Sequence, residues 1–411
     1  MKKLVLCLVG FSMLMHESFA QNKLSAMQKD SLAGTINTIT TAVPFLLIAP
    51  DSRAGGMGDV GAATTPDANS IHWNPAKLAF IEDDIGFSVS YTPWLRALVN
   101  DINLAYLSAY KKLKDDQTIA MSLLYFSLGN ITFTDIYGNT TGQFNPNEFA
   151  IDAAYSRKLG EDFSGGLALR YIYSNLTGGY GVSNTTSHAG TSVAADISVY
   201  YKHEIQISGK KTMWSSGADI SNIGAKMSYT NTGTQDFIPT NLRIGSALTT
   251  DLDEYNRFTF TLDANKLLVP TPPVYLRNVS GGDSLDANGN QIILAGKDPN
   301  VGVPTGMIQS FSDAPGGATE QWREWTWSAG LEYWYDKQFA IRAGYFHEAA
   351  TKGNRQYFTV GAGLKYNVFG LDFAYLIPTQ QRNPLENTLR FTLIFDFAGL
   401  KKENQDKDKT E

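Results

Sequence analysis

The residues of this chain that are best suited to chemistry are scattered, and their spacing argues against a catalytic centre. Gly56, Gly58 and Gly61 match the glycine pattern that binds a dinucleotide at the start of a helix. That pattern needs a preceding strand and a following helix, and prolines interrupt the sequence on both sides of it. We therefore interpret these glycines as positions at which backbone segments pack closely together.

Histidines and acidic residues also lack the spacing of a site. The four histidines beyond residue 20 include no close pair and no glutamate partner at the spacing of zinc ligands. They are His72, His188, His203 and His347. The run Asp286-x-Asn288-x-Asn290 resembles the start of a calcium loop, but Lys297 stands where the closing glutamate would be. We predict no catalytic residue, no metal and no cofactor, and hence no enzyme.

The elements that would position functional residues are strands with strict alternation. In the last of them Phe391, Leu393 and Phe395 share one face, while Arg390 and Thr392 share the other. About fourteen such stretches follow one another between residues 85 and 397. This pattern predicts an all-β fold, a transmembrane antiparallel β-barrel of about 14 strands. A soluble β-sandwich or propeller would also alternate, but its strands would be shorter.

The links between these stretches alternate between short charged turns and longer segments. The longer links are 129–147, 176–190, 222–240, 267–324, 348–355 and 378–387. Outer-membrane barrels have short periplasmic turns and long extracellular loops. The pattern therefore predicts extracellular long links and places both termini in the periplasm.

Composition supports export to an outer membrane. Residues 1–20 have the form of a signal peptide: Lys2 and Lys3 precede an apolar run that ends at a small-x-small site. The single cysteine, Cys7, lies inside this segment, so the mature chain has no thiol chemistry. The net charge of −6 gives no reason to expect nucleic acid. A mean hydropathy of −0.20 excludes a protein with many membrane-spanning helices.

We divide the remaining chain by composition. Residues 21–42 form a polar N-terminal segment, 43–80 a plug or hatch, 81–397 the barrel and 398–411 a polar periplasmic tail. The plug does not alternate and is rich in Gly, Ala, Asp and Asn, which predicts that it lies inside the barrel or across its mouth. The residues that we single out as its structural motif are Asp51, Arg53, Gly55, Gly56, Gly58, Asp59, Asn69, Trp73, Asn74 and Pro75.

Charged residues on the polar faces of the strands have two interpretations. They could form a site, or they could form a wet barrel lumen linked by salt bridges, and we favour the lumen. These residues are Asp152, Arg170, Asp196, Asp263, Glu332, Arg342, Asp372 and Arg390.

Residues 49–59 and 70–76 of the plug resemble the PorV family, outer-membrane components of the type IX secretion system of the Bacteroidetes. The resemblance extends over the mature chain. The family in turn is similar to the FadL transporters of hydrophobic compounds, whose N-terminal hatch plugs a barrel of fourteen strands and carries a similar Asn-Pro-Ala. The resemblance implies a FadL-like plugged barrel without enzyme activity and supplies no catalytic residues.

The resemblance also implies partners. PorV-like proteins bind the C-terminal signal domain of secreted cargo as it leaves the outer-membrane translocon. They deliver it to the cell-surface sortase PorU, which removes the signal and attaches the cargo to lipopolysaccharide. A FadL-type transporter of hydrophobic small molecules is the alternative, and an enzyme acting on membrane lipid is a third interpretation that lacks a clustered nucleophile and base.

Cargo binding would use the extracellular loops, above all the link 267–324. Long loops of this kind are usually functional or mobile. Its apolar residues Val301, Met307, Ile308 and Phe311 are candidates for partner contact. The other interpretation is that they fold back to cap the barrel, and the sequence leaves both open.

Overall fold

The computed structural model describes most of the chain between Ser25 and Phe397. The described residues are 25–397 apart from 97, 100, 180–186, 232, 234, 279–280 and 381–382. The predicted signal peptide and the predicted tail at 398–411 lie outside them. In the part that is described, no helix is both long enough and apolar enough to cross a bilayer.

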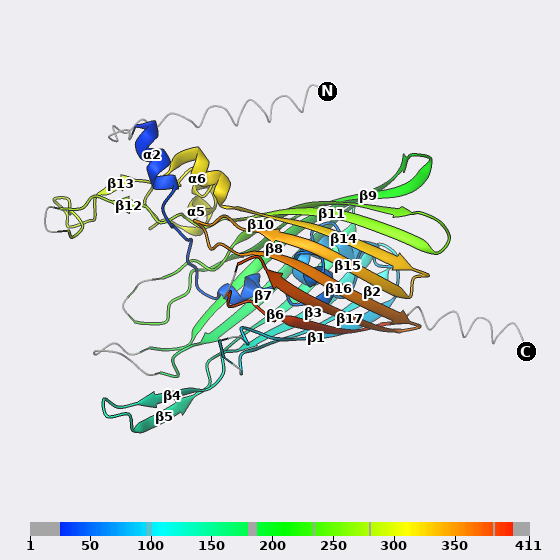
Figure 1. The fold of residues 1–411 in the computed structure, drawn as a ribbon, viewed down its shortest axis with the longest axis horizontal. Coiled ribbons are helices and arrows are strands. Elements are labelled where there is room, and N and C mark those ends of the chain that lie inside the picture. The colour runs from blue at the N-terminus through cyan, green and yellow to red at the C-terminus, as the bar shows by residue number, and fades with distance from the viewer. Residues whose placement is uncertain are drawn as a thin grey trace, which may run out of the picture.

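Within the described residues, fourteen antiparallel strands form one closed barrel (Figure 1). In chain order they are β1 (Ile85–Pro93), β2 (Asn103–Lys114), β3 (Gln117–Ser127), β6 (Asn147–Lys158), β7 (Phe163–Asn175), β8 (Gly190–Ile207), β9 (Lys210–Gly224), β10 (Asn241–Asp251), β11 (Asn256–Leu267), β14 (Trp325–Tyr335), β15 (Phe339–His347), β16 (Gln356–Tyr366), β17 (Phe369–Pro378) and β18 (Leu389–Phe397). The first strand pairs with the last, Ile85 opposite Phe397, so the wall has no free edge. The predicted fold class is confirmed.

The wall is polar inside and apolar outside. In β18 the side chains of Arg390 and Thr392 are buried in the interior, whereas Phe391 and Leu393 are exposed on the outer surface. An exposed apolar surface combined with a buried polar one is the reverse of a soluble protein and suits a wall that faces hydrocarbon. The alternation seen in the sequence therefore corresponds to two chemically different faces.

Aromatic side chains mark the two ends of the wall. The rings of Trp325 and Trp327 lie 6.3 Å apart at the end that carries the long links. The rings of Tyr255 and Tyr335 stack at 6.4 Å at the end that carries the short turns. We call these the loop end and the turn end of the barrel. Rings of this kind suit the headgroup layers of a membrane.

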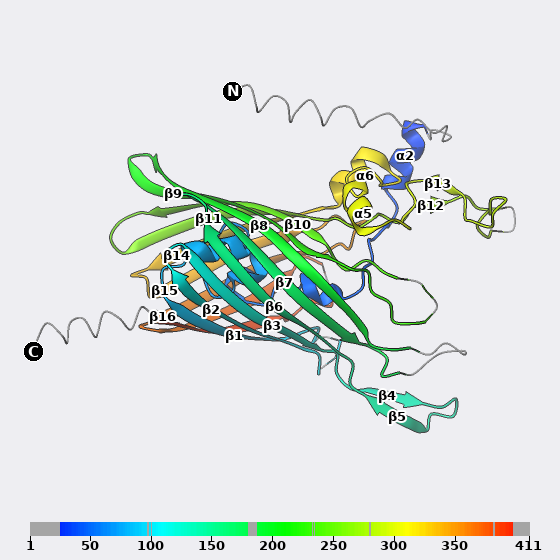
Figure 2. The same ribbon diagram turned by 180° about the vertical axis from the view of Figure 1, so that it is seen from behind.

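The remaining elements are short and lie inside the barrel or at its loop end (Figures 1 and 2). Those before the barrel are α2 (Ala26–Ala33), η1 (Pro44–Leu47), α3 (Ser52–Gly55), α4 (Ser70–Trp73) and η2 (Pro75–Phe80). Those in the long links are β4 (Ile131–Thr134), β5 (Thr140–Phe144), β12 (Val274–Tyr275), β13 (Ile293–Ala295), α5 (Val303–Gln309) and α6 (Gly317–Arg323).

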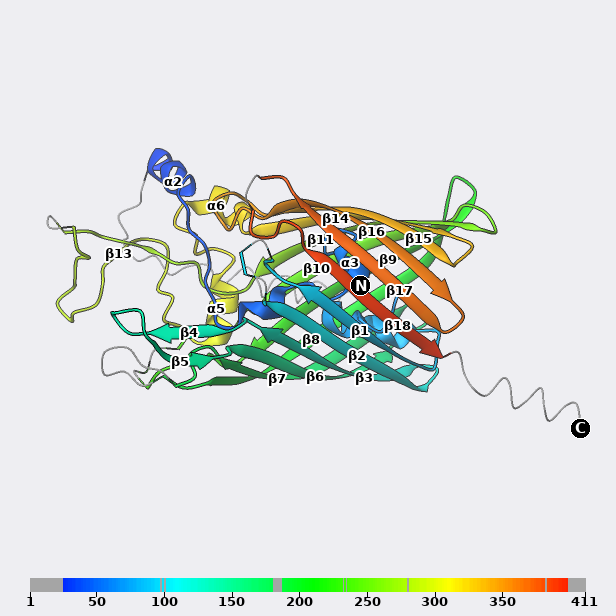
Figure 3. The same ribbon diagram turned by 60° about the horizontal axis from the view of Figure 1, so that its bottom comes forward.

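The chain passes through its own barrel. Helix α2 packs on α6 at the loop end, residues 43–80 fill the interior, and the chain leaves at the turn end to begin β1 (Figure 3). The last strand also finishes at the turn end. The first and last described residues therefore lie at opposite ends of the barrel and not on one side as predicted for the termini, while which end faces the periplasm stays a prediction. The sequence pattern of the strands fixes the end of β18, but it carries no information about a segment that precedes them.

Glycines of the wall provide the space for the plug. A Cβ atom added at Gly344 would overlap the backbone of Met57 and Gly58, and one at Gly330 would lie 2.7 Å from the carbonyl oxygen of Met57. Gly58 itself has a φ of +74°, which an L side chain rarely adopts. The plug backbone thus rests directly on the backbone of β14 and β15, as close packing by glycines predicts.

Single cysteines will test the orientation and the path of the chain. Cysteines that replace Thr38, Asn139 or Asp286 should react with an impermeant thiol reagent on intact cells, because all three sites lie at the loop end. A cysteine at Lys210, in the turn between β8 and β9, should react only after the outer membrane is opened. Labelling of Lys210→Cys alone on intact cells would invert the predicted orientation.

Substitution of a wall glycine will test the seat of the plug. Gly344→Val should displace the plug at a cost of about 1–3 kcal/mol or more in stability. The added side chain would overlap the backbone of Met57 and Gly58, which cannot move aside as the end of a flexible side chain can. The wall hydrogen bonds are unchanged, so the barrel should still fold. We expect higher conductance in planar bilayers than for Ala343→Val, whose side chain points outward from the adjacent position. Equal conductance of the two variants would show that the plug does not depend on this contact.

Candidate functional site

The plug is shaped locally by one buried aspartate. Asp51 caps α3, because its Oδ1 atom accepts the backbone N–H of Ala54 at 2.9 Å. Its Oδ2 atom accepts the indole N–H of Trp73 at 2.6 Å and so joins α3 to α4. A single carboxylate therefore holds the two short helices of the plug together.

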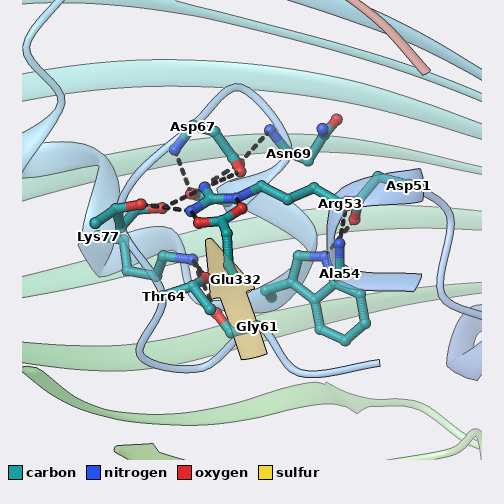
Figure 4. A network of polar contacts seen from close by, with 12 residues as sticks. Asp51, Arg53, Ala54, Gly61, Thr64, Asp67, Asn69, Lys77 and Glu332 are labelled. Atoms are coloured by element: carbon teal, nitrogen blue, oxygen red, sulfur yellow. Dashed lines mark hydrogen bonds and ion pairs between the residues drawn. The ribbon is translucent and has the colours of Figure 1, made fainter. Parts of the chain in front are cut away.

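An arginine joins the plug to the wall. Arg53 donates from Nε and Nη2 to both carboxylate oxygens of Glu332 on β14, at 3.0 and 2.9 Å, and from Nη1 to Asp67 at 2.8 Å (Figure 4). Glu332 also accepts from Arg342 Nε at 2.7 Å, and Arg342 Nη1 donates to Asp372 at 2.7 Å. Removal of one member of such a buried pair typically costs about 3–5 kcal/mol.

Further contacts satisfy the backbone of the plug. The Oδ2 atom of Asp263 on β11 accepts the N–H groups of Gly61 and Ala62 at 2.7 and 2.8 Å. Lys77 donates to the carbonyl oxygen of Gly61 at 2.8 Å and to Thr64 Oγ1 at 2.9 Å (Figure 4). Buried backbone groups need such partners, and here the wall and the plug supply them to each other.

The other motif residues predicted for the plug also lie in the interior. Asp59 accepts from Arg390 at 2.6 Å, and Asn69 accepts from Ser88 of β1 and from Ser108 of β2. Asn74 caps η2 through the N–H of Ala76 and donates to the carbonyl oxygens of Ala62 and Val199. Pro75 is the first residue of η2, Gly55 lies against Arg390, and Gly56 lies against Gly361. Their structural role remains our interpretation.

The glycine pattern and the calcium-like run singled out in the sequence have local structural surroundings in the described residues. The three glycines of the dinucleotide-like pattern follow α3: Gly56 is its C-cap, Gly56 and Gly58 lie against the wall, and Gly61 lies against Trp73. Among the described residues, no group of three or more His, Cys, Asp or Glu side chains could hold a metal ion. Asp286 accepts the backbone N–H groups of Asn288 and Asn290, and these bonds, led by that from Asn290, lower the pKa of its carboxyl. The Asp286 turn is therefore closed by its own backbone.

A second structure lies above the plug at the loop end. We call residues 302–324, which include α5 and α6, the outer platform. Glu324 at its end receives Lys266 Nζ at 2.6 Å and Lys352 Nζ at 3.1 Å, and Lys352 also pairs with Glu320 at 2.6 Å. All four side chains are buried. The cluster fixes α6 to the ends of β11 and β14 and to the link that contains Lys352.

Neutral donors complete this cluster. Thr271 donates from its hydroxyl to Glu324 at 2.7 Å and from its backbone N–H to Asp313 at 2.9 Å. Burial raises the pKa of Asp313. Gln321 donates to Glu324 and to the carbonyl oxygen of Ser310, which links α6 to α5. The platform is therefore a small ordered unit rather than an open loop.

The N-terminal segment is fastened to the same unit. Arg323 donates to the carbonyl oxygen of Ala33, and the amide of Asn37 donates to Glu320 at 2.9 Å. The backbone N–H of Asn37 donates to the carbonyl oxygen of Thr351 at 3.0 Å. Residues 34–42 therefore connect the outer platform to the plug below it.

The four candidate residues of the long link divide into two pairs. Ile308 on α5 and Phe311 just after it are 76% and 48% exposed. Met307 and Val301 are half-buried. Three of the four lie in the outer platform and Val301 directly precedes it; two of them face outward and two are partly covered.

Sequence reasoning missed one aromatic residue of the platform. Trp322 on α6 is 64% exposed, and with Phe311 it lines a hollow of about 450 Å³. Trp325, Gln321 and the stem of Lys266 form other parts of its wall. Because the sequence neighbours of Trp322 are polar, no apolar pattern marked it as a contact residue. Only its place on a short helix that follows the apolar run could have indicated it.

The fold is similar to that of several solved barrels at low sequence identity. The toluene transporter TodX of Pseudomonas putida is 11% identical, with 88% of this chain and 98% of that chain covered and a TM-score of 0.47. The toluene transporter TbuX of Ralstonia pickettii is 10% identical, with coverage of 85% and 98% and a TM-score of 0.44. The CymD monoaromatic hydrocarbon channel is 14% identical, with coverage of 86% and 99% and a TM-score of 0.47. No curated protein matches the sequence.

A family profile identifies the chain more specifically. The profile described as type IX secretion system protein PorV matches residues 31–274, which is more than half of the chain. The match begins in the N-terminal segment, contains the whole plug and continues through β11. The chain is therefore an outer-membrane β-barrel that belongs to the PorV family of the type IX secretion system.

Proposed function

We propose that the outer platform binds the C-terminal signal domain of secreted cargo at the translocon and that the barrel carries this cargo to the sortase PorU. Membership of the PorV family supports a role in type IX secretion. The observation that carries the proposal is the presence of exposed apolar side chains, Ile308, Phe311 and Trp322, on a unit that buried ion pairs hold in place. In this role the protein binds and transfers cargo and catalyses no reaction.

The rigidity of the platform supports binding. Exposed apolar side chains that gather on one surface commonly mark a protein-binding site, and Phe311 and Trp322 line one hollow. Aromatic anchors contribute most when they are already ordered, because less conformational entropy is lost on association. Phe311 also packs within 5.7 Å of the Lys266 ammonium group, which further fixes its ring. A folded β-domain could place one apolar side chain into the hollow between Phe311 and Trp322.

The contacts of the plug favour a carrier whose barrel stays closed while it binds and transfers cargo. Residues 43–80 are bound to strands on several sides of the wall, among them β1 through Ser88, β11 through Asp263 and β14 through Glu332. Transport of a hydrophobic small molecule, the alternative interpretation, requires a path past these contacts. Cargo bound at the outer platform requires none. Contact with lipopolysaccharide would then occur through the membrane that surrounds the barrel.

Replacement of the apolar side chains will test cargo binding. The triple variant Ile308→Ser, Phe311→Ser, Trp322→Ser should fold and insert, because none of these residues belongs to the wall. We expect secretion of signal-bearing cargo, and its co-purification with the barrel, to fall at least about tenfold, since loss of one or more anchors costs about 2 kcal/mol or more. The matched control is Ile136→Ser, Tyr137→Ser on the tip between β4 and β5, where both side chains are more than 80% exposed. Normal secretion by the triple variant would exclude the platform as the binding surface.

Removal of one buried cation will test the rigidity of the platform. Lys266→Met should destabilise the platform locally by about 3–5 kcal/mol, because Glu324 loses a buried partner. Limited proteolysis of the barrel in detergent should then cleave after Arg323, and cargo binding should weaken. Lys297→Met, which removes an exposed lysine of the same link, should change neither. A platform that resists the protease equally in both variants would show that its order does not depend on the ion pairs.

A further inference from the structure

A long groove crosses the outer face of the wall, on the side opposite to the plug. It has a volume of about 720 Å³ and extends over six neighbouring strands, β8, β9, β10, β11, β14 and β15, and reaches the first residue of β7. These strands are consecutive neighbours in the order of the barrel wall. The groove is separate from the outer platform, and it faces the membrane.

The register of the strands explains the floor of the groove. Ser216 lies opposite Ser246, Ser246 lies opposite Leu262, and Leu262 lies opposite Ala329, so that three of the four side chains in this row are small. The adjacent outward row contains Ala218 opposite Ile244 and Ala264 opposite Trp327. Outer positions elsewhere in the wall carry many larger side chains, as on β18. The wall is therefore thin at this place.

Bulky side chains form the rims. Trp327 lies opposite His347 at one end of the groove, and Tyr201 lies opposite Phe163 at the other. His347 is the last residue of β15, at the loop end, and Phe163 is the first residue of β7, at the turn end. Because barrel strands are tilted by roughly 35–45°, a row that crosses them also climbs through the membrane. The groove thus leads from one aromatic boundary of the hydrocarbon layer to the other.

The side chains that face the groove include no Lys, Arg or Glu, and the carboxylate of Asp263, which borders the groove, points inward to Gly61 and Ala62. Neither row contains Lys, Arg, Asp or Glu. The serine hydroxyls are occupied within the wall: Ser246 accepts the indole N–H of Trp214 at 3.0 Å and donates to the carbonyl oxygen of Ser215 at 3.2 Å. The occupant must therefore be apolar along its length and flexible enough to follow a narrow floor.

We propose that this groove is a binding site for an acyl chain of a phospholipid, which stays bound when the protein leaves the membrane. The hydrocarbon layer supplies such chains at the surface where the groove opens. The convex wall of another barrel would rest on the rims at Trp327 and Tyr201 and leave the floor empty. Lipopolysaccharide would bring clustered phosphates to the loop end, where the groove has no Lys or Arg side chain to pair with them.

Lipid analysis of the purified barrel will test the site. The protein is purified in detergent from native membranes, and its retained lipids are extracted and quantified by mass spectrometry. We expect phospholipid to be retained by the native protein. In the variant Ser246→Leu, Ala329→Leu, retention should fall about tenfold, the change expected when roughly two methylene groups lose their contacts.

Matched variants make the result decisive. Ala153→Leu adds the same side chain at an outward position of β6 beyond the groove and should retain lipid as the native protein does. Ala264→Leu fills the second row and should also lose the lipid. It provides the test should the double variant fold poorly. Native protein without phospholipid, equal retention by the groove variants, retention of lipopolysaccharide instead, or a photo-crosslink from position 329 to a protein would each overturn the proposal.

Discussion

The structure depends on the need to fill a closed wall of fourteen strands without leaving polar groups unpaired. Closure satisfies the backbone of the wall, but a ring of this size encloses more space than its own side chains can occupy. Residues 43–80 fill that space, and their short helices expose many backbone groups that cannot reach water. The inward carboxylates and guanidinium groups of the wall are placed to receive them, as Asp263 does for Gly61 and Ala62.

The inward charges therefore have two uses. Arg170 with Asp152 and Asp196 links strands within the wall. Glu332 and Arg390 instead pair with Arg53 and Asp59 of the plug. Because buried charges tolerate the loss of a partner poorly, the plug and the wall each require the other in its present place. This mutual dependence gives the outer platform a fixed base, through residues 34–42 and through Lys266 on β11.

The sequence was sufficient for the wall and insufficient for what lies within and above it. Alternation has a period that any strand must show when its faces meet different media, so the strands from Ile85 to Phe397 could be placed to within a few residues. The pairing of Arg53 with Glu332 joins residues 279 positions apart, and no local pattern encodes it. For the same reason the position of α2 at the loop end and the exposure of Trp322 could not be predicted, since both follow from packing between distant segments.

The path of the chain through its own barrel has a consequence for biogenesis. Residues 25–42 lie at one end of the ring and Ile85 at the other, and the plug binds both strands of the seam, Ser88 of β1 and Arg390 of β18. A ring that closed first would have to be threaded by a free N-terminal tail. If the seam instead closes around the segment that already lies across it, closure and filling are a single event. The finished barrel then cannot be separated from the segment that passes through it.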